Sequence, residues 1–210
     1  MTCIDFVESN SHCSICNRTI KTNIAILHND MILGRTCAKN QNINLLKIPN
    51  LTKGLINDNE AGSETESSTK PSSKTEEMID KKSCKEYLML RCDKLSDIKS
   101  MNTEKLNEIY EKSKHSEISN EDFYYLCNLI KKMNREKTVF SERNIHFCYI
   151  MKFELHRLIN KTQNNNFFKD LLAFLRQHAH LTEKQFESIK NNLKLKTKYV
   201  TVCQNPKRII

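Results

Sequence analysis

Residues 13–37 read CSICNRTIKTNIAILHNDMILGRTC, and this stretch decides the fold of the N-terminal part of the chain. Cys13 and Cys16 form a C-x₂-C pair, a spacing at which the intervening turn points both sulfur atoms toward one metal ion. His28 and Cys37 follow, so that the complete spacing is C-x₂-C-x₁₁-H-x₈-C. Four nitrogen and sulfur ligands in a short polar segment are typical of tetrahedral structural zinc. We therefore predict one structural Zn²⁺ as cofactor, bound by Cys13, Cys16, His28 and Cys37.

The sequence between these ligands predicts a β-hairpin followed by a helix. Residues 22–27 and 31–33 have the composition of two strands, and the polar residues between them form the turn. Gly34 then ends the second strand, and Thr36 is placed to cap a short helix over 37–47. The hairpin and the helix would bring the distant ligand Cys37 back toward the C-x₂-C pair.

A metal-binding knuckle, a hairpin and a helix in this order resemble the treble-clef zinc architecture. A treble clef usually supplies two ligands from its helix, whereas this helix offers Cys37 and then Asn40, which is a poor ligand. His28 is therefore the fourth ligand in this interpretation. Cys3 and His12 remain the alternatives to His28.

The alternative to a zinc site is a group of reduced cysteines in a small hairpin domain. A segment of this size with few large apolar side chains seldom folds without a metal or disulfides. The first residues, MTCIDFVESN, lack the basic and apolar regions of a secretion signal, so the nine cysteines favour metal ligation over a disulfide framework. Because four protein ligands leave no position for an activated water, we expect the zinc to be structural.

Composition divides the chain into three predicted parts. Residues 1–50 form the Cys/His zinc-binding module, residues 51–82 a linker, and residues 83–210 a basic α-helical domain. The linker is rich in Ser, Thr, Glu and Lys, and it cannot bury enough apolar surface to offset its ordering entropy. We therefore expect a disordered tether between the two folded parts.

The predicted fold class is mainly α: a small zinc-stapled module of hairpin and helix, tethered to a C-terminal helical bundle. Three glycines and three prolines in the whole chain are too few for the turns of an all-β protein. Ser119 and Ser141 are expected to be N-caps, and Thr182 with Gln185 forms a capping box. Apolar residues recur at helical spacing over residues 84–97, 103–113, 120–134, 142–161, 166–179 and 182–195.

No motif of a catalytic site is present in the sequence. Its glycines are isolated, so no glycine-rich loop can surround a phosphate group, and the hydrolase and zinc-protease motifs G-x-S-x-G and H-E-x-x-H are missing. Cys127 and Cys148 lie on apolar helix faces, and we interpret them as small buried hydrophobic residues. The sequence therefore predicts that the protein is not an enzyme.

The formal net charge of +9 is carried by the helical part of the chain. A basic surface favours an acidic partner, of which nucleic acid is the most common. The alternative is that the last two helices form a hairpin that closes the core, with its lysines facing water. Basic side chains gather toward the C-terminus, and the predicted phosphate contacts are Lys190, Lys194, Lys196, Lys198, Lys207 and Arg208.

These observations predict a zinc-dependent, non-enzymatic regulatory protein that associates with nucleic acid. The alternative function is a zinc-stabilised adaptor that binds another protein. No apolar run reaches the roughly 18–20 residues that cross a membrane, so we expect no membrane partner. We expect an intracellular location, either nuclear or cytoplasmic.

Overall fold

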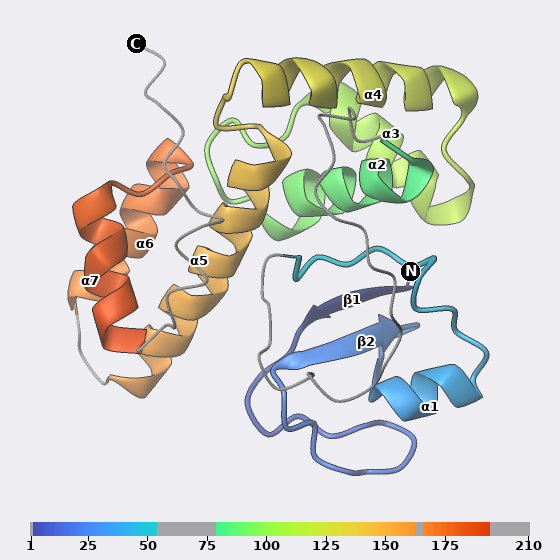
Figure 1. Cartoon of the computed structure of the whole chain (residues 1–210), viewed down its shortest axis with the longest axis horizontal. Coiled ribbons are helices and arrows are strands. Elements are labelled where there is room, and N and C mark those ends of the chain that lie inside the picture. The colour runs from blue at the N-terminus through green and yellow to red at the C-terminus, as the bar shows by residue number, and fades with distance from the viewer. Residues whose placement is uncertain (1, 54–78, 163–165, 194–210) are drawn as a thin grey trace, which may run out of the picture.

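The structure is a computed structural model, and it describes residues 2–53, 79–162 and 166–193 (Figure 1). Within these residues the chain forms three β-strands, seven α-helices and one π-helix. The strands lie in the N-terminal part and the longer helices in the C-terminal part, which confirms the mainly α fold class. Most of the predicted linker, residues 54–78, lies outside the described residues.

The strands form one antiparallel sheet in the order β1-β2-β3. Strands β2 (Ile24–His28) and β3 (Met31–Leu33) are the two arms of the predicted hairpin, which is confirmed. Asn29 and Asp30 connect them with φ angles of 46° and 64°. This is the left-handed geometry of a two-residue type I′ turn, which Asn and Asp tolerate better than most side chains.

The third strand, β1 (Thr2–Phe6), is not predicted by the sequence pattern. It pairs with β2 in a register that places Thr2 opposite His28. On its other side, the amide of Ile4 donates to the carbonyl of Pro49 at 2.8 Å, and the amide of Leu51 donates to the carbonyl of Ile4 at 2.9 Å. The segment around Pro49 and Leu51 therefore returns alongside β1.

Helix α1 (Arg35–Asn40) is shorter than the predicted helix over 37–47. Its N-cap is Gly34 rather than Thr36, and no side chain caps it. The chain leaves the helix through Asn42, whose φ of 57° is incompatible with a further helical turn. Residues 41–47, which the prediction includes in the helix, follow its end, and this part of the prediction is wrong. Leu46 in this segment is 85% exposed.

The helical segments predicted for the C-terminal part are all present, with ends that differ by a few residues. The first of them continues without a break from an α-helix into a π-helix. The elements are α2 (Lys81–Leu88), η2 (Met89–Lys94), α3 (Glu104–His115), α4 (Asn120–Arg135), α5 (Glu142–Lys161), α6 (Asn166–His178) and α7 (Glu183–Leu193).

Of the three helix caps predicted for the C-terminal part, two are confirmed. The Ser119 hydroxyl accepts from the amide of Asp122 at 3.1 Å. Thr182 and Gln185 form the reciprocal capping box, with the Gln185 amide donating to the Thr182 hydroxyl at 3.3 Å and the Thr182 amide donating to Gln185 Oε1 at 2.8 Å. Ser141 makes no side-chain cap bond.

The sheet and the helices share one hydrophobic core. Cys3 and Phe6 of β1 and Leu51 pack with the buried residues of α2, η2, α3 and α5. Phe6 stacks on Phe153 of α5 with ring centroids 4.2 Å apart. Figure 1 shows the sheet beside α5 and below α2. The N-terminal module therefore packs directly against the C-terminal helices, although the sequence predicts a disordered tether between the two parts.

Polar contacts join the same two parts of the molecule. Asp5 is 2% exposed; its carboxylate lies 2.8 Å from the Lys94 ammonium and accepts a hydrogen bond from the Tyr149 hydroxyl. Glu86 of α2 is equally buried, and it accepts from the Asn50 amide at 2.8 Å. Buried carboxylates with partners on the other part fix how the sheet lies against the helices.

One titratable group at this junction makes the stability depend on pH. Burial lowers the pKa of His146 from 6.5 to about 4, and the nearby Lys53 ammonium acts in the same direction. The imidazole is therefore neutral in the folded chain at pH 5, while an unfolded chain takes up a proton there. A depressed histidine pKa contributes stability that is complete above pH 6.5 and is lost as the pH falls toward 4.

We expect the free energy of unfolding to fall by up to about 3 kcal/mol across this interval because of His146. Denaturant unfolding at several pH values measures this slope. The His146→Gln variant should have a flatter profile, and His115→Gln, a change at an exposed position, should keep the wild-type profile. Parallel profiles for wild type and His146→Gln would contradict this assignment.

Candidate metal centre

The neighbouring Cys13 and Cys16 lie together with Cys37, which is distant from them in the sequence. Cys13, Cys16 and Cys37 have sulfur atoms within 4.8 Å of one another. Three thiolates that share one tetrahedral zinc at 2.3 Å would be separated by about 3.8 Å, so only a small adjustment is required. The group could hold a metal ion, and thiolates favour a soft or borderline one.

Backbone hydrogen bonds hold the turn that carries the first two cysteines. The amide of Cys13 donates to the carbonyl of Arg18 at 3.0 Å, and the amide of Asn17 donates to the carbonyl of Cys13 at 2.9 Å. Ser14 ties this turn to β3, because its amide donates to the Ile32 carbonyl at 2.7 Å and its hydroxyl accepts from the Ile32 amide at 3.0 Å. The knuckle is therefore fixed to the edge of the sheet.

The third cysteine is positioned by α1, whose first turn contains Cys37. Ala38, next to it, is fully buried and packs with Ile26, Leu33 and Cys13 in a second, smaller core beside the cysteines. This core anchors the helix on the sheet. The cysteine group itself opens to solvent, because Cys16 is exposed and Cys37 is half-buried.

The thiols of Cys13 and Cys37 differ in acidity. Burial opposes ionisation of Cys13, but hydrogen bonds from the amides of Gly34, Cys16 and Ile15 outweigh it and lower the pKa of Cys13 to about 6. Hydrogen bonding to Cys16 and to Cys13 raises the pKa of Cys37 to about 11. A metal that binds all three sulfur atoms must displace protons, so its affinity should rise with pH.

The structure does not bring His28 to this group. Its Nδ1 lies 2.7 Å from the Thr2 hydroxyl, and its Nε2 lies 3.2 Å from Asn29 Nδ2. His28 is at the turn end of the hairpin, opposite Met31, whereas the Cys13 sulfur lies 3.5 Å from the amide of Gly34, the residue that follows β3. At about 3.3 Å per residue, the length of β3 separates the two positions. Spacing along the sequence does not reveal this separation.

The two alternatives to His28 do not join the group either. His12 lies close in sequence, but its Nε2 is 3.2 Å from the Thr19 hydroxyl. Cys3 is buried among the residues that face the helices. Among the residues that the structure describes, the group holds three cysteines and no fourth Cys, His, Asp or Glu.

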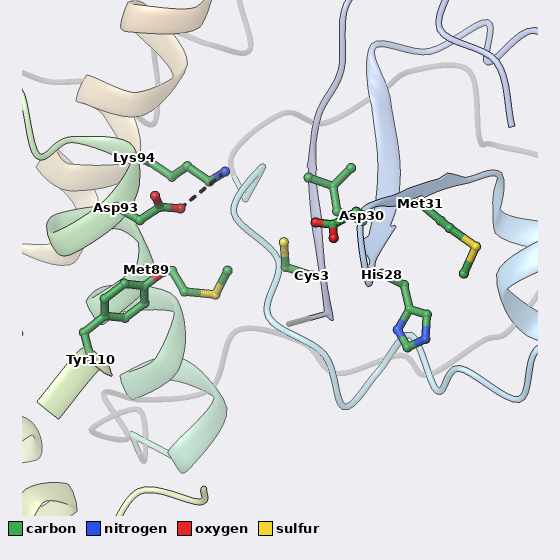
Figure 2. A pocket seen from close by; sticks show the side chains of 9 residues that line it. Cys3, His28, Asp30, Met31, Met89, Asp93, Lys94 and Tyr110 are labelled. Atoms are coloured by element: carbon green, nitrogen blue, oxygen red, sulfur yellow. Dashed lines mark ion pairs between the residues drawn. The ribbon is translucent and has the colours of Figure 1, made fainter. Parts of the chain in front are cut away.

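His28 and Cys3 instead line a pocket of about 400 Å³ between the sheet and the helices (Figure 2). From the helical side, Met89, Lys94 and Tyr110 line it. Burial raises the pKa of Cys3 to about 12, so its thiol stays protonated at neutral pH. A protonated, buried thiol is not an activated nucleophile.

The positions predicted to contact nucleic acid are only partly described. Lys190 lies on α7, where its ammonium is 3.4 Å from the Glu187 carboxylate and its side chain is 23% exposed. Lys194, Lys196, Lys198, Lys207 and Arg208 lie outside the described residues. The contacts predicted for these six residues stay predictions.

Comparisons with protein-family models, with curated proteins and with solved structures find no match to this chain. None of the helices in the described part of the chain is both long enough and apolar enough to cross a membrane.

Proposed function

We propose that the chain is a zinc-dependent, non-enzymatic regulatory protein that binds nucleic acid. The observation that carries the proposal is the group of Cys13, Cys16 and Cys37, which joins the knuckle to α1 through sulfur atoms within 4.8 Å of one another. In this proposal these three side chains hold one zinc ion, and the ion supplies a cross-link within a module whose own core is small.

Several features support zinc over an unliganded cysteine group. In the part of the chain that the structure describes, the second core contains four buried residues, Cys13, Ile26, Leu33 and Ala38. Such a small core contributes little stability, so a metal cross-link would contribute a large part of it. The low pKa of Cys13 keeps one thiolate available at neutral pH. Among the common divalent metals, zinc is one that thiolate ligands favour.

The non-enzymatic part of the proposal is supported by the state of the other cysteines. Cys148 is fully buried on α5, and its sulfur lies 3.1 Å from the carbonyl of Ala179. Burial likewise raises the pKa of Cys3 and of Cys92, the latter to about 11. Catalytic cysteines need the opposite, a lowered pKa in an accessible place.

A specific observation favours the adaptor as a second candidate. Ile15 in the knuckle is 47% exposed, and Leu46 in the loop after α1 is 85% exposed. Both belong to the metal module, and exposed apolar side chains on a rigid module are a feature of protein-docking surfaces. An adaptor would bind its partner through this module and would show no affinity for nucleic acid.

Binding of a fluorescent oligonucleotide to the zinc-loaded full-length chain tests the proposed function. Anisotropy titrations over a range of salt concentrations should show binding at low ionic strength, with log K falling linearly as log salt rises. Affinity should drop when zinc is removed and return when it is added back. A folded, zinc-loaded chain that binds neither DNA nor RNA at low salt would contradict the proposal and leave the adaptor as the function to test.

A further inference from the structure

Helix α4 carries exposed aromatic and basic side chains on its outer side. Tyr124 is 67% and Tyr125 39% exposed, which makes them two of the few large apolar side chains that the described surface leaves open to water. Lys131, Lys132 and Arg135 on the same helix are exposed as well. We call these five residues the α4 stripe.

Helical spacing places the stripe on one side of the helix. Tyr124, Asn128, Lys131 and Arg135 follow one another at intervals of three or four residues, and all four are exposed. Tyr125 and Lys132 flank this row. At 1.5 Å per residue the row extends over about 16 Å, with the tyrosines at the N-terminal end and the cations at the C-terminal end.

The opposite side of α4 fixes the stripe in place. Leu126 and Ile130 are fully buried in the main core, and α4 packs against α2 and α5. The helix lies at the edge of the helical region, with α2 and α3 between it and the sheet in Figure 1. Because Ser119 also caps the first turn, the side chains of the stripe project from a rigid backbone.

The described residues neutralise little of the positive charge of the stripe. No ion pair of Lys131 or Lys132 is found among them, and Arg135 makes one long, exposed contact of 3.8 Å with Glu136. Asp122, near the tyrosines, is occupied by the Ser119 hydroxyl at 2.9 Å. A helix C-terminus attracts cations by its dipole, which could account for Lys132 and Arg135 but not for two exposed tyrosines.

We propose that the α4 stripe binds single-stranded nucleic acid, with the tyrosine rings stacking on bases and the three cations contacting phosphates. The inference rests on the proposed function and gives it a site. Charge complementarity selects a polyanion, and the exposed rings select a strand whose bases are unpaired, because duplex bases have no free face for stacking.

Two sets of variants test the two halves of the stripe in the full-length, zinc-loaded chain. Tyr124→Ala/Tyr125→Ala should weaken binding of a single-stranded oligonucleotide roughly 10-fold or more, whereas Tyr124→Phe/Tyr125→Phe should retain it because the rings remain. Lys131→Gln/Lys132→Gln/Arg135→Gln should weaken binding and reduce the log–log salt slope by about two, since each phosphate contact to a single strand contributes about 0.7.

The matched control removes the same charge elsewhere. Lys112→Gln/Lys169→Gln/Lys184→Gln changes three exposed lysines on α3, α6 and α7. Its salt slope should stay close to that of the wild type. All substituted positions are exposed, and thermal unfolding of each variant confirms that it folds.

Equal weakening by the α4 and control triples would overturn the inference, because only net charge would then matter. Tighter binding of a duplex than of a single strand, or no effect of Tyr124→Ala/Tyr125→Ala, would overturn it too. In these three cases the wild type still binds, so the proposed function stands without this site. A wild type that binds no nucleic acid would overturn both.

Discussion

The Cys16→Ser variant is expected to bind zinc at least roughly 100-fold more weakly than the wild type. Replacing a residue that only hydrogen-bonds to a metal ligand already lowers metal affinity by about 10–100-fold, and here a ligand itself is lost. Serine conserves the size of the side chain but removes one of only three thiolates in the group. Cys16 is exposed, so the substitution should not disturb packing. Competition with a chelating dye under reducing conditions measures the affinity.

Loss of the metal should also loosen the knuckle. The amides of Cys13, Ser14 and Asn17 are hydrogen-bonded within the turn or to β3, and we expect them to exchange with deuterium faster in Cys16→Ser or after chelation. Amides of α5 should keep their protection, because the main core does not depend on the cysteine group. Unchanged zinc affinity and unchanged exchange in Cys16→Ser would contradict the metal assignment.

Two further variants make this comparison specific. Cys92→Ser changes a cysteine outside the group and should retain wild-type zinc affinity. Asn40→Cys adds a thiol one helical turn after Cys37, on the same side of α1, at an exposed position. We expect this variant to bind zinc more tightly than the wild type, because a fourth thiolate completes a tetrahedral set.

The Asp5→Ala variant is expected to lose about 2–4 kcal/mol of unfolding free energy, because removing one partner of a buried ion pair leaves the other uncompensated. Lys94 and the Tyr149 hydroxyl both rely on this carboxylate. Lys94 remains 25% exposed in its side chain, so water compensates part of the loss. Chemical denaturation followed by circular dichroism measures the difference.

Glu8→Ala is the matched control, since Glu8 is an exposed carboxylate close to the same strand. Its stability should stay within about 0.5 kcal/mol of the wild type. A double-mutant cycle of Asp5→Ala with Tyr149→Phe should give a coupling energy well above the roughly 0.5 kcal/mol within which independent substitutions add. Equal stabilities of Asp5→Ala and Glu8→Ala would show that the contact between β1 and α5 carries no stability.

The helices could be predicted from the sequence because each has an apolar face and residues that mark where it begins or ends. In α4, for example, Leu126 and Ile130 mark the buried side and Ser119 the start, and both are properties of neighbouring residues. The hairpin was predictable for the same reason, since Asn29 and Asp30 suit a turn that Met31–Leu33 follows directly. The helices and the hairpin were therefore predictable because each depends on residues that are close together in the sequence.

Strand β1 could not be predicted, because its buried positions are Cys3 and Asp5. A carboxylate in the sequence predicts a surface position. Asp5 is buried because Lys94 and Tyr149, which are distant in the sequence, both bind its carboxylate. The same limit applies to the packing of the N-terminal module on the helices. Both depend on residues far apart in the chain, which sequence periodicity does not connect.

The candidate site was predictable in part. The C-x₂-C pair and Cys37 were found by spacing, and the structure places their sulfur atoms together. The same spacing assigned His28, which lies at the turn of the hairpin and is not part of the group. The apolar periodicity of α4 does not reveal the α4 stripe, although Tyr124 and Tyr125 precede Lys131 and Lys132 on the same predicted helix.

Zinc stoichiometry of the purified wild-type chain is the most direct test of the central claim. The protein is reconstituted with zinc under reducing conditions, passed through a desalting column, and measured by elemental analysis and by native mass spectrometry. The account predicts one zinc ion per chain, retained through desalting and absent from Cys16→Ser. A folded wild-type chain that retains no metal would contradict it, and Cys13, Cys16 and Cys37 would then be three neighbouring thiols with no common ligand.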